Sequence, residues 1–179
     1  MLRISGGEFR SRLLKTPDTT LTKPTMDKVR NGIFSALQND IKGKKVLDLF
    51  AGSGSYGFES LSRGASKATF VDNGVEAIKV IKENARALDV LDRTEIYKQD
   101  SFSYLLDSKE EFDIIFVDPP YKKYDYKEIV SAILNANVLA KKGILVLESD
   151  YNLDVDLSSF TKSKEYKYSQ TYVYILRRE

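Results

Sequence analysis

From Lys45 onward the sequence alternates between short apolar runs and segments with helical periodicity, and this alternation constrains the fold more than any other feature. The runs are as short as buried strands, whereas the segments between them repeat apolar residues at the spacing of an amphipathic helix. Strands that alternate with helices form a mostly parallel sheet with helices on both faces. The expected strands are 46–50, 68–71, 94–98, 114–117 and 144–147, and the expected helices are 56–62, 74–88 and 126–137.

The alternation stops after residue 148. Residues 166–168 and 172–176 are rich in Tyr, Val and Ile, and they predict two further strands joined by a short turn. Such a terminal hairpin would add an antiparallel strand to the edge of the sheet. A chain of this length fits one domain, so we expect a single α/β domain over residues 1–179.

The N-terminal part of the chain lies outside this alternation and is expected to form an appendage. Residues 2–4 and 9–15 predict a short β-ribbon. Apolar residues at helical spacing predict an amphipathic helix over 26–41, with Thr25 as its N-cap and Gly43 just beyond its end.

This N-terminal part is also basic. Residues 1–45 contain ten Lys/Arg and four Asp/Glu, a net charge of +6, whereas the whole chain carries +2. A basic segment on a mildly acidic body is typical of a protein that binds a polyanion, and composition alone fits a solvated basic face equally well.

The chain contains no cysteine and no histidine. Disulfides, thiolate metal sites and cysteine nucleophiles are therefore excluded, and any catalysis must proceed without imidazole. The lack of cysteine favours an intracellular setting. No apolar run is long enough to span a membrane, and the N-terminus lacks the apolar core of a signal peptide. We expect a cytoplasmic protein with no metal and no membrane partner.

The first expected strand runs into a glycine-rich loop that contains Gly52, Gly54 and Gly57. Glycines after the first strand of such a sheet let a ligand approach the backbone closely. As a bare pattern, this spacing also matches the dinucleotide-binding fingerprint, and it fits a simple tight turn as well. The acidic residues nearby help to choose among these interpretations.

Three aspartates, Asp48, Asp72 and Asp100, stand at the ends of three successive expected strands. An acid as close to the loop as Asp48 disfavours a pyrophosphate and suits a ligand with a positive amino group, such as S-adenosyl-L-methionine. Asp72 follows the loop at the distance of an acid that binds ribose hydroxyls, and Asp100 is placed to accept a hydrogen bond from an adenine amino group. Because ligands of open α/β sheets bind at the carboxyl ends of the strands, we expect the cofactor there.

The expected strand 114–117 ends in Asp118-Pro119-Pro120-Tyr121. The prolines stiffen this turn, which presents a carboxylate, carbonyl groups and an aromatic ring at the same sheet edge as the glycine loop. An exocyclic base amine is a poor nucleophile because its lone pair is delocalised into the ring. The Asp118 carboxylate and the Pro119 carbonyl can accept its hydrogens and localise that lone pair, while Tyr121 stacks on the base. The motif therefore indicates methylation of a nucleobase amine.

Together these motifs resemble the RsmD-type 16S rRNA guanine-N2 methyltransferases of bacteria, over nearly the whole chain. The matching stretches are Arg3-Ile4-Ser5-Gly6-Gly7 with Arg10 and Arg12, Thr22-Lys23-Pro24-Thr25, Val29-Arg30, Asp48-Leu49-Phe50-Ala51-Gly52-Ser53-Gly54, Leu61-Ser62-Arg63-Gly64-Ala65 and Asp118-Pro119-Pro120-Tyr121. The glycine and proline motifs occur in many amino-methyltransferases, so the N-terminal stretches give the narrower match.

The resemblance implies a class I S-adenosylmethionine-dependent methyltransferase fold, Rossmann-like, with a mostly parallel seven-stranded sheet, an antiparallel terminal hairpin, and the N-terminal ribbon and helix added. It implies methylation of one guanine of 16S rRNA during small-subunit assembly, with residues 1–42 as an RNA-docking extension of a monomer. The S-adenosyl-L-methionine site would comprise Asp48, Phe50, Ala51, Gly52, Ser53, Gly54, Asp72, Asn73, Asp100 and Ser101, the catalytic site Asp118, Pro119, Pro120 and Tyr121, and the RNA-binding set Arg3, Arg10, Arg12, Lys23 and Arg30.

The sequence departs from the family pattern at a few positions. Lys23 stands where an arginine is usual, Asp72 stands where a glutamate is common, and Glu8 places an acid within the basic ribbon. These differences bear on affinity more than on the type of reaction.

Three other functions remain open from the residues. The glycine spacing would also suit a nicotinamide-dependent oxidoreductase, although Asp48 and the proline motif argue against it. A non-catalytic RNA-binding assembly factor could share this scaffold. A DNA adenine-N6 methyltransferase shares the Asp118–Tyr121 motif, but such enzymes usually carry a target-recognition insertion, for which 179 residues leave little room.

Overall fold

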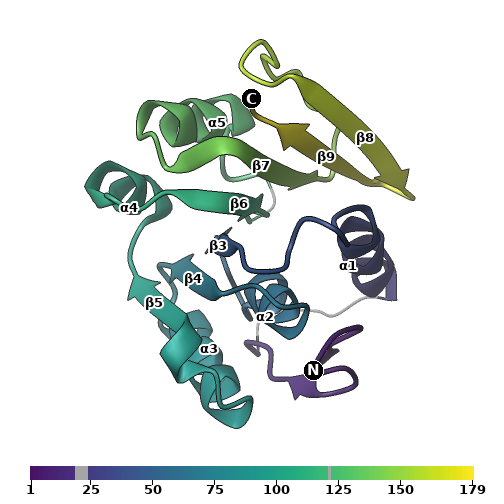
Figure 1. Cartoon of the computed structure of the whole chain (residues 1–179), viewed down its shortest axis with the longest axis vertical. Helices are drawn as coiled ribbons and strands as arrows, with labels where there is room; N and C mark the ends of the chain where they lie inside the picture. The colour runs from purple at the N-terminus through teal and green to yellow at the C-terminus, as the bar shows by residue number, and fades with distance from the viewer. Residues whose placement is uncertain (19–23, 121) are drawn as a thin grey trace.

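The computed structural model describes residues 1–18, 24–120 and 122–179. A seven-stranded sheet with strand order β5-β4-β3-β6-β7-β9-β8 runs through the molecule (Figure 1). Its β5-to-β7 pairs are parallel, and β9 is antiparallel to both β7 and β8. The predicted fold class is thereby confirmed. The sheet and its connecting helices are β3 (Lys45–Leu49), α2 (Ser55–Ser62), β4 (Lys67–Asp72), α3 (Val75–Ala87), the short 3-10 helix Leu91–Arg93, β5 (Thr94–Lys98), α4 (Ser101–Asp107), β6 (Phe112–Val117), α5 (Tyr126–Asn135), β7 (Leu139–Ser149), β8 (Lys162–Tyr168) and β9 (Thr171–Arg177).

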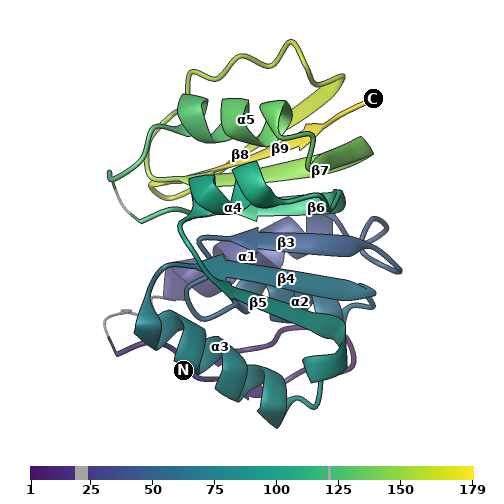
Figure 2. The same cartoon turned by 90° about the vertical axis from the view of Figure 1, so that its left-hand side faces the viewer.

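Helices cover both faces of the sheet. Residues of α1 (Pro24–Ala36), α2 and α3 pack with one face, and residues of α4 and α5 pack with the other. In Figure 2, α4 and α5 lie in front of the sheet, and α1 and α2 lie behind it. The central strands β3 and β6 are apolar on both faces, as strands buried between two helical layers must be.

Several elements differ from the sequence prediction. The helix α4 was not predicted; it is a short helix whose N-cap, Asp100, accepts a hydrogen bond from the backbone N–H of Ser103. The strand β7 begins at Leu139, five residues before the predicted start at 144, so the predicted run is only the buried part of a longer strand.

The N-terminal ribbon forms, but with only two residues in each strand: β1 (Leu2–Arg3) pairs antiparallel with β2 (Leu13–Leu14). The helix α1 ends at Ala36, so the predicted helix over 26–41 was too long. Leu37 and Ile41 are fully buried in a turn against the core, which explains why they continue the helical apolar pattern. Because α1 begins at Pro24, Thr25 lies inside the helix and is not its N-cap.

A buried carboxylate on α2 fixes the N-terminal segment to the sheet domain. Glu59 is 1% exposed and accepts hydrogen bonds from the backbone N–H groups of Ser5 and Gly6 at 3.1 Å. It also accepts from Arg63 Nε at 3.0 Å, and its Oε2 lies 3.7 Å from Arg30 Nε. These contacts hold the ribbon and α1 beside α2, next to the carboxyl ends of the parallel strands.

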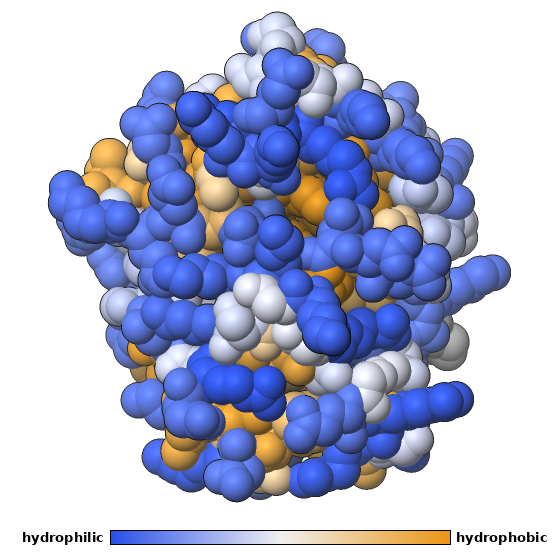
Figure 3. All heavy atoms as spheres, viewed as in Figure 1, coloured by the Kyte–Doolittle hydropathy of each residue, from blue (hydrophilic) through white to orange (hydrophobic). Residues whose placement is uncertain are grey.

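The surface is mainly hydrophilic on the face that Figure 3 shows, with hydrophobic residues visible in gaps between polar side chains. Among the described residues, no helix is both long enough and apolar enough to cross a membrane.

Candidate active site

A cavity of about 650 Å³ opens at the carboxyl ends of β3, β4, β5 and β6. The strand β3 pairs with β4 on one side and β6 on the other, so the cavity lies at the point where the strand order reverses. Open α/β sheets bind their ligands at this point, and the volume is typical of small-molecule sites. The lining residues are Leu2, Met26, Phe50, Ala51, Gly52, Ser53, Ser55, Tyr56, Asp72, Asn73, Ser101, Asp118, Pro119, Pro120, Lys123 and Tyr124.

Most of the residues predicted for the cofactor and the reaction therefore come together in one cavity. Two predicted residues, Lys23 and Tyr121, lie outside the described residues. Asp48, Gly54 and Asp100 are described but do not line the cavity. The predicted residues that line it are Phe50, Ala51, Gly52, Ser53, Asp72, Asn73, Ser101, Asp118, Pro119 and Pro120.

The glycine loop forms one wall of the cavity. Gly52 has φ +57°, and a Cβ built on it would meet no atom within 4 Å, so its backbone faces open space. Phe50 also has a positive φ of 60°, which is strained for a non-glycine residue and of a kind that clusters at functional sites. Its ring packs against Tyr124 with the ring centroids 4.8 Å apart.

Asp72 lies at the end of β4 and holds the neighbouring loops. Its two carboxylate oxygens accept hydrogen bonds from the backbone N–H groups of Gly52 at 2.9 Å and Gly74 at 2.8 Å. The side chain is only partly buried and lines the cavity. Each oxygen has a second lone pair, so Asp72 can also accept hydrogen bonds from a ligand.

Asp48 does not occupy the expected position facing the ligand. It is 2% exposed and accepts a hydrogen bond from the backbone N–H of Gly57 at 3.0 Å. Burial raises the pKa of Asp48 to about 8, against the lowering effect of that hydrogen bond. Burial thus disfavours, in the folded chain, the negative charge that the sequence analysis assigned to Asp48. Asp48 does accept the hydrogen bond of the Gly57 N–H, which is one of the first N–H groups of α2 and one that a bound pyrophosphate would need.

Gly54 and Asp100 have structural positions next to the site. A Cβ on Gly54 would lie 2.7 Å from Phe58 and 2.9 Å from Phe70, so this glycine permits close packing of the loop on the core. Asp100 caps α4 and is exposed, while its neighbour Ser101 lines the cavity.

At the other end of the cavity, Asp118 is part of an acidic cluster that the sequence analysis missed. Val117 pairs with Leu147 in the parallel register of β6 and β7, so the next residues, Asp118 and Glu148, are neighbours. Removal from water and the charge of Glu148 raise the pKa of Asp118 well above its ordinary value. Burial likewise raises the pKa of Glu148, although the hydroxyl of Tyr56, which donates to Glu148 Oε2, opposes the rise. Such neighbouring carboxyls with raised pKa values are typical of functional sites.

The N-terminal segment also reaches the cavity, through Leu2 and Met26. The sequence predicted this segment only as an RNA-docking surface. The Glu59 contacts explain its position, but a single buried glutamate in the middle of a helix is not a signal that sequence reasoning could have used.

The predicted RNA-binding arginines differ in exposure. Arg3, Arg10 and Arg12 are exposed, with Arg3 and Arg12 donating to the backbone carbonyls of Ser11 and Ala87. Arg30 is 4% exposed and donates to the Arg3 carbonyl at 2.6 Å. Because its guanidinium is buried among protein groups, the prediction that Arg30 contacts RNA is corrected to a structural role.

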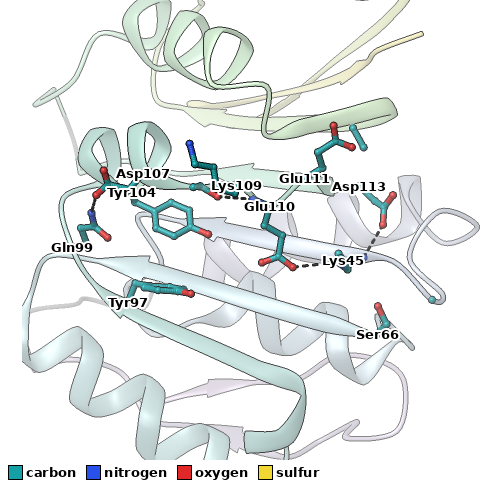
Figure 4. A pocket seen from close by; sticks show the side chains of 13 residues that line it. Lys45, Ser66, Tyr97, Gln99, Tyr104, Asp107, Lys109, Glu110, Glu111 and Asp113 are labelled. Atoms are coloured by element: carbon teal, nitrogen blue, oxygen red, sulfur yellow. Dashed lines mark hydrogen bonds and ion pairs between the residues drawn. The ribbon is translucent and has the colours of Figure 1, made fainter.

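A second hollow, of about 870 Å³, lies under α4 near the amino ends of β3 and β6 (Figure 4). Its charged groups are largely paired with one another: Lys45 contacts Glu110 and Asp113, and Gln99 donates to Asp107. Although it is larger, it contains none of the residues predicted for a site. Of the strand carboxyl ends, where such sheets bind ligands, it reaches only that of β5, at Tyr97 and Gln99.

The strand order and the cavity at the carboxyl ends define the fold of the class I S-adenosylmethionine-dependent methyltransferases. The chain belongs to the family described as Conserved hypothetical protein 95, which matches residues 2–177.

Several known proteins are similar to this chain. YlbH of Bacillus subtilis, described as a candidate rRNA methyltransferase, is 36% identical over 157 residues, covering 86% of this chain and 85% of YlbH. Ribosomal RNA small subunit methyltransferase D of Escherichia coli K12 is 32% identical over 149 residues, covering 83% of this chain and 75% of that protein. The solved structure of yhhF from Escherichia coli, described as a candidate methyltransferase, superposes with a TM-score of 0.89 at 29% identity, over 99% of this chain and 98% of the other.

A more distant solved structure shares only the fold. The Thermus thermophilus 16S rRNA N2 G1207 methyltransferase, in complex with AdoMet and guanosine, superposes with a TM-score of 0.70 at 18% identity. The match covers 92% of this chain and 45% of that chain.

Proposed function

We propose that this protein uses S-adenosyl-L-methionine to methylate the exocyclic N2 amine of a guanine in 16S rRNA during assembly of the small ribosomal subunit. The observation that carries the proposal is the single cavity that joins Gly52 and Asp72 at one end to Asp118 and Pro119 at the other. The name of the Escherichia coli relative, a small-subunit rRNA methyltransferase, supports the choice of substrate.

The cofactor end of the cavity fits S-adenosyl-L-methionine. The open space beside Gly52 admits a ligand against the backbone, and the partly exposed carboxylate of Asp72 can accept hydrogen bonds from ribose hydroxyls. Asn73 and Ser101 continue the wall toward β5, where the adenine would lie. The N–H of Gly57 is taken by Asp48, which argues against a nicotinamide dinucleotide, since its pyrophosphate would need free N–H groups at this helix start.

The other end of the cavity suits the target amine. The carboxyl of Asp118 and the carbonyl of Pro119 can accept the two amine hydrogens, which localises the nitrogen lone pair and orients it. When bound, S-adenosyl-L-methionine would supply the methyl group, with the sulfur keeping the electrons of the broken methyl–sulfur bond, and the proton lost by the methylated nitrogen would pass to the Asp118 carboxylate or to water. The protein contributes mainly alignment of the reacting groups.

The N-terminal extension, residues 1–42, is proposed as the RNA-docking surface. Arg3, Arg10 and Arg12 are exposed on it, and Lys23 belongs to the same proposed set. Contacts from these side chains would be to phosphates, which set affinity and position but do not identify the base.

The test compares Asp118→Ala with Asp113→Ala, a matched change at the amino end of the same strand. We expect Asp118→Ala to abolish most methyl transfer in single-turnover assays with labelled cofactor, while calorimetry shows nearly unchanged cofactor affinity. Asp113→Ala should retain activity. Near-normal single-turnover rates in Asp118→Ala would contradict the assigned role.

A further inference from the structure

A smaller cavity of about 200 Å³ adjoins the main one and shares Asp118, Pro119 and Pro120 with it. Glu148, Tyr126 and Thr171 are among the residues that complete its wall. It therefore begins where the proposed acceptors of the target amine lie and extends away from the cofactor end. This is the space into which the rest of the target base would fit.

The strand register aims Glu148 into this region. Glu148 follows Leu147 on β7 as Asp118 follows Val117 on β6, and neighbouring strands are about 4.8 Å apart. Side chains alternate along a strand, so Glu148 is on the same face as Val146, which packs in the core beneath α1 and α2. The two carboxyl groups thus lie side by side at one sheet edge.

One oxygen of Glu148 is fixed and the other is available. Tyr56 donates its hydroxyl to Oε2, and the Tyr56 ring stacks on Phe116 with centroids 5.1 Å apart and 11° between the ring planes. Among the hydrogen bonds made by residues 1–18, 26–120 and 123–179, none reaches Oε1. Burial raises the pKa of Glu148, whereas the Tyr56 hydrogen bond and the charge of Arg30 act against this rise and favour the ionised form. Because Tyr56 fixes Oε2, Oε1 is an acceptor with a fixed orientation.

We infer that Glu148 selects guanine by accepting the N1–H of the target base at Oε1, beside the N2 amine held by Asp118 and Pro119. Guanine presents N1–H and the N2 amine as adjacent donors on one edge. A base with a lone pair at N1 would face the carboxylate with acceptor against acceptor, which leaves both groups unpaired and is strongly rejected. This inference rests on the proposed function and names the residue that determines its specificity.

The experiment isolates N1 from the methylated amine. The substrates are small subunits reconstituted with 16S rRNA that carries either guanine or 2-aminopurine at the mapped nucleotide. Both bases have the 2-amino group, but 2-aminopurine has a lone pair at N1. The proteins compared are wild type, Glu148→Gln, and Glu165→Gln, which makes the same chemical change on an exposed residue of β8.

We expect the wild type and Glu165→Gln to prefer guanine strongly. Glu148→Gln should lose about 10- to 100-fold in kcat/KM on guanine. The ratio of kcat/KM for guanine to kcat/KM for 2-aminopurine should also fall at least tenfold, because the glutamine amide can donate to N1 of 2-aminopurine. Tyr56→Phe, which frees the carboxylate to turn, should narrow the preference by a smaller factor. Cofactor affinity, measured by calorimetry, should stay unchanged in each variant and shows that each is folded.

If Glu148→Gln binds the cofactor normally and still prefers guanine over 2-aminopurine as strongly as the wild type does, the inference is overturned. An equal loss on both bases would also overturn it, because that result means a structural role. Failure of the proposed function has a different signature, since the wild type itself would then leave the guanine N2 amine unmethylated.

Discussion

Replacing Glu59 with alanine should destabilise the protein by about 3–5 kcal/mol, because Glu59 is the buried carboxylate beside the buried Arg30, whose other ionic partner, Asp27, is half-exposed. The side chains of Glu59 and Arg30 are 1% and 5% exposed, and their charged atoms lie 3.7 Å apart. Ser5, Gly6 and Arg63, the other partners of Glu59, are less deeply buried and can turn toward water. The guanidinium of Arg30 cannot. It keeps its ion pair with Asp27 at 3.0 Å, but the Asp27 side chain is 51% exposed, so the loss of the only fully buried carboxylate beside Arg30 among the described residues sets the size of the effect.

Equilibrium unfolding in urea measures this effect. The control is Glu83→Ala, which removes a carboxylate from an ion pair with Lys15 at 3.0 Å whose side chains are 33% and 57% exposed. Such a surface pair contributes at most about 1 kcal/mol. Adding Arg30→Met to Glu59→Ala should recover part of the loss, because it removes the buried charge that has lost its buried carboxylate. A loss in Glu59→Ala within about 1 kcal/mol of the control, or no recovery in the double variant, would refute the reasoning.

Three further changes test other parts of the account. Asp72→Ala should weaken S-adenosyl-L-methionine binding about 10- to 100-fold in calorimetry, the effect of losing a charged acceptor, and unchanged affinity would remove Asp72 from the site. Asp48 keeps its proton up to a pKa of about 8 in the folded protein and loses it near 3.8 when unfolded, so it makes stability fall as pH rises between these values. Asp48→Asn should flatten that fall in urea unfolding from pH 5 to 8, and an unchanged slope would contradict the raised pKa. Arg10→Ala should weaken binding to small subunits and reduce the magnitude of the slope of log affinity against log salt concentration by about 1. The control Lys141→Ala, which changes an exposed residue near the amino end of β7, should change neither quantity. Equal effects of the two changes would place the docking surface elsewhere.

The sheet and the cavity could be predicted because their signals are local. The apolar runs mark the strands, and glycine and proline motifs mark the loops that follow β3 and β6. Since the carboxyl ends of parallel strands meet at one edge, Gly52, Asp72 and Asp118 were expected to lie together, and they line one cavity. The predicted end of α1 was wrong because buried residues continue the apolar pattern beyond the end of the helix. The predicted start of β7 was wrong because the first residues of that strand are partly polar and exposed.

The roles of individual acids were harder to predict, because they depend on packing between distant segments. Asp48 and Asp72 both follow apolar residues in the last two positions of a strand, yet the first is buried against α2 and the second lines the cavity. Asp100 was interpreted as a ligand-binding residue. In the structure it accepts a hydrogen bond from the Ser103 N–H as the N-cap of α4, the helix that the sequence analysis missed. Glu148 ends a strand without any neighbouring motif. Its position depends on the register between β6 and β7, which the sequence does not show.

The measurement that tests the central claim most directly is a map of the methylated nucleotide. Small subunits from a strain that lacks the gene would be incubated with the purified protein and labelled S-adenosyl-L-methionine. The 16S rRNA would then be digested, and its fragments would be sequenced by mass spectrometry. The account predicts one labelled N2-methylguanine with the wild type and none with Asp118→Ala. Label on an adenine N6 amine would contradict the substrate, and equal label with Asp118→Ala would contradict the active site.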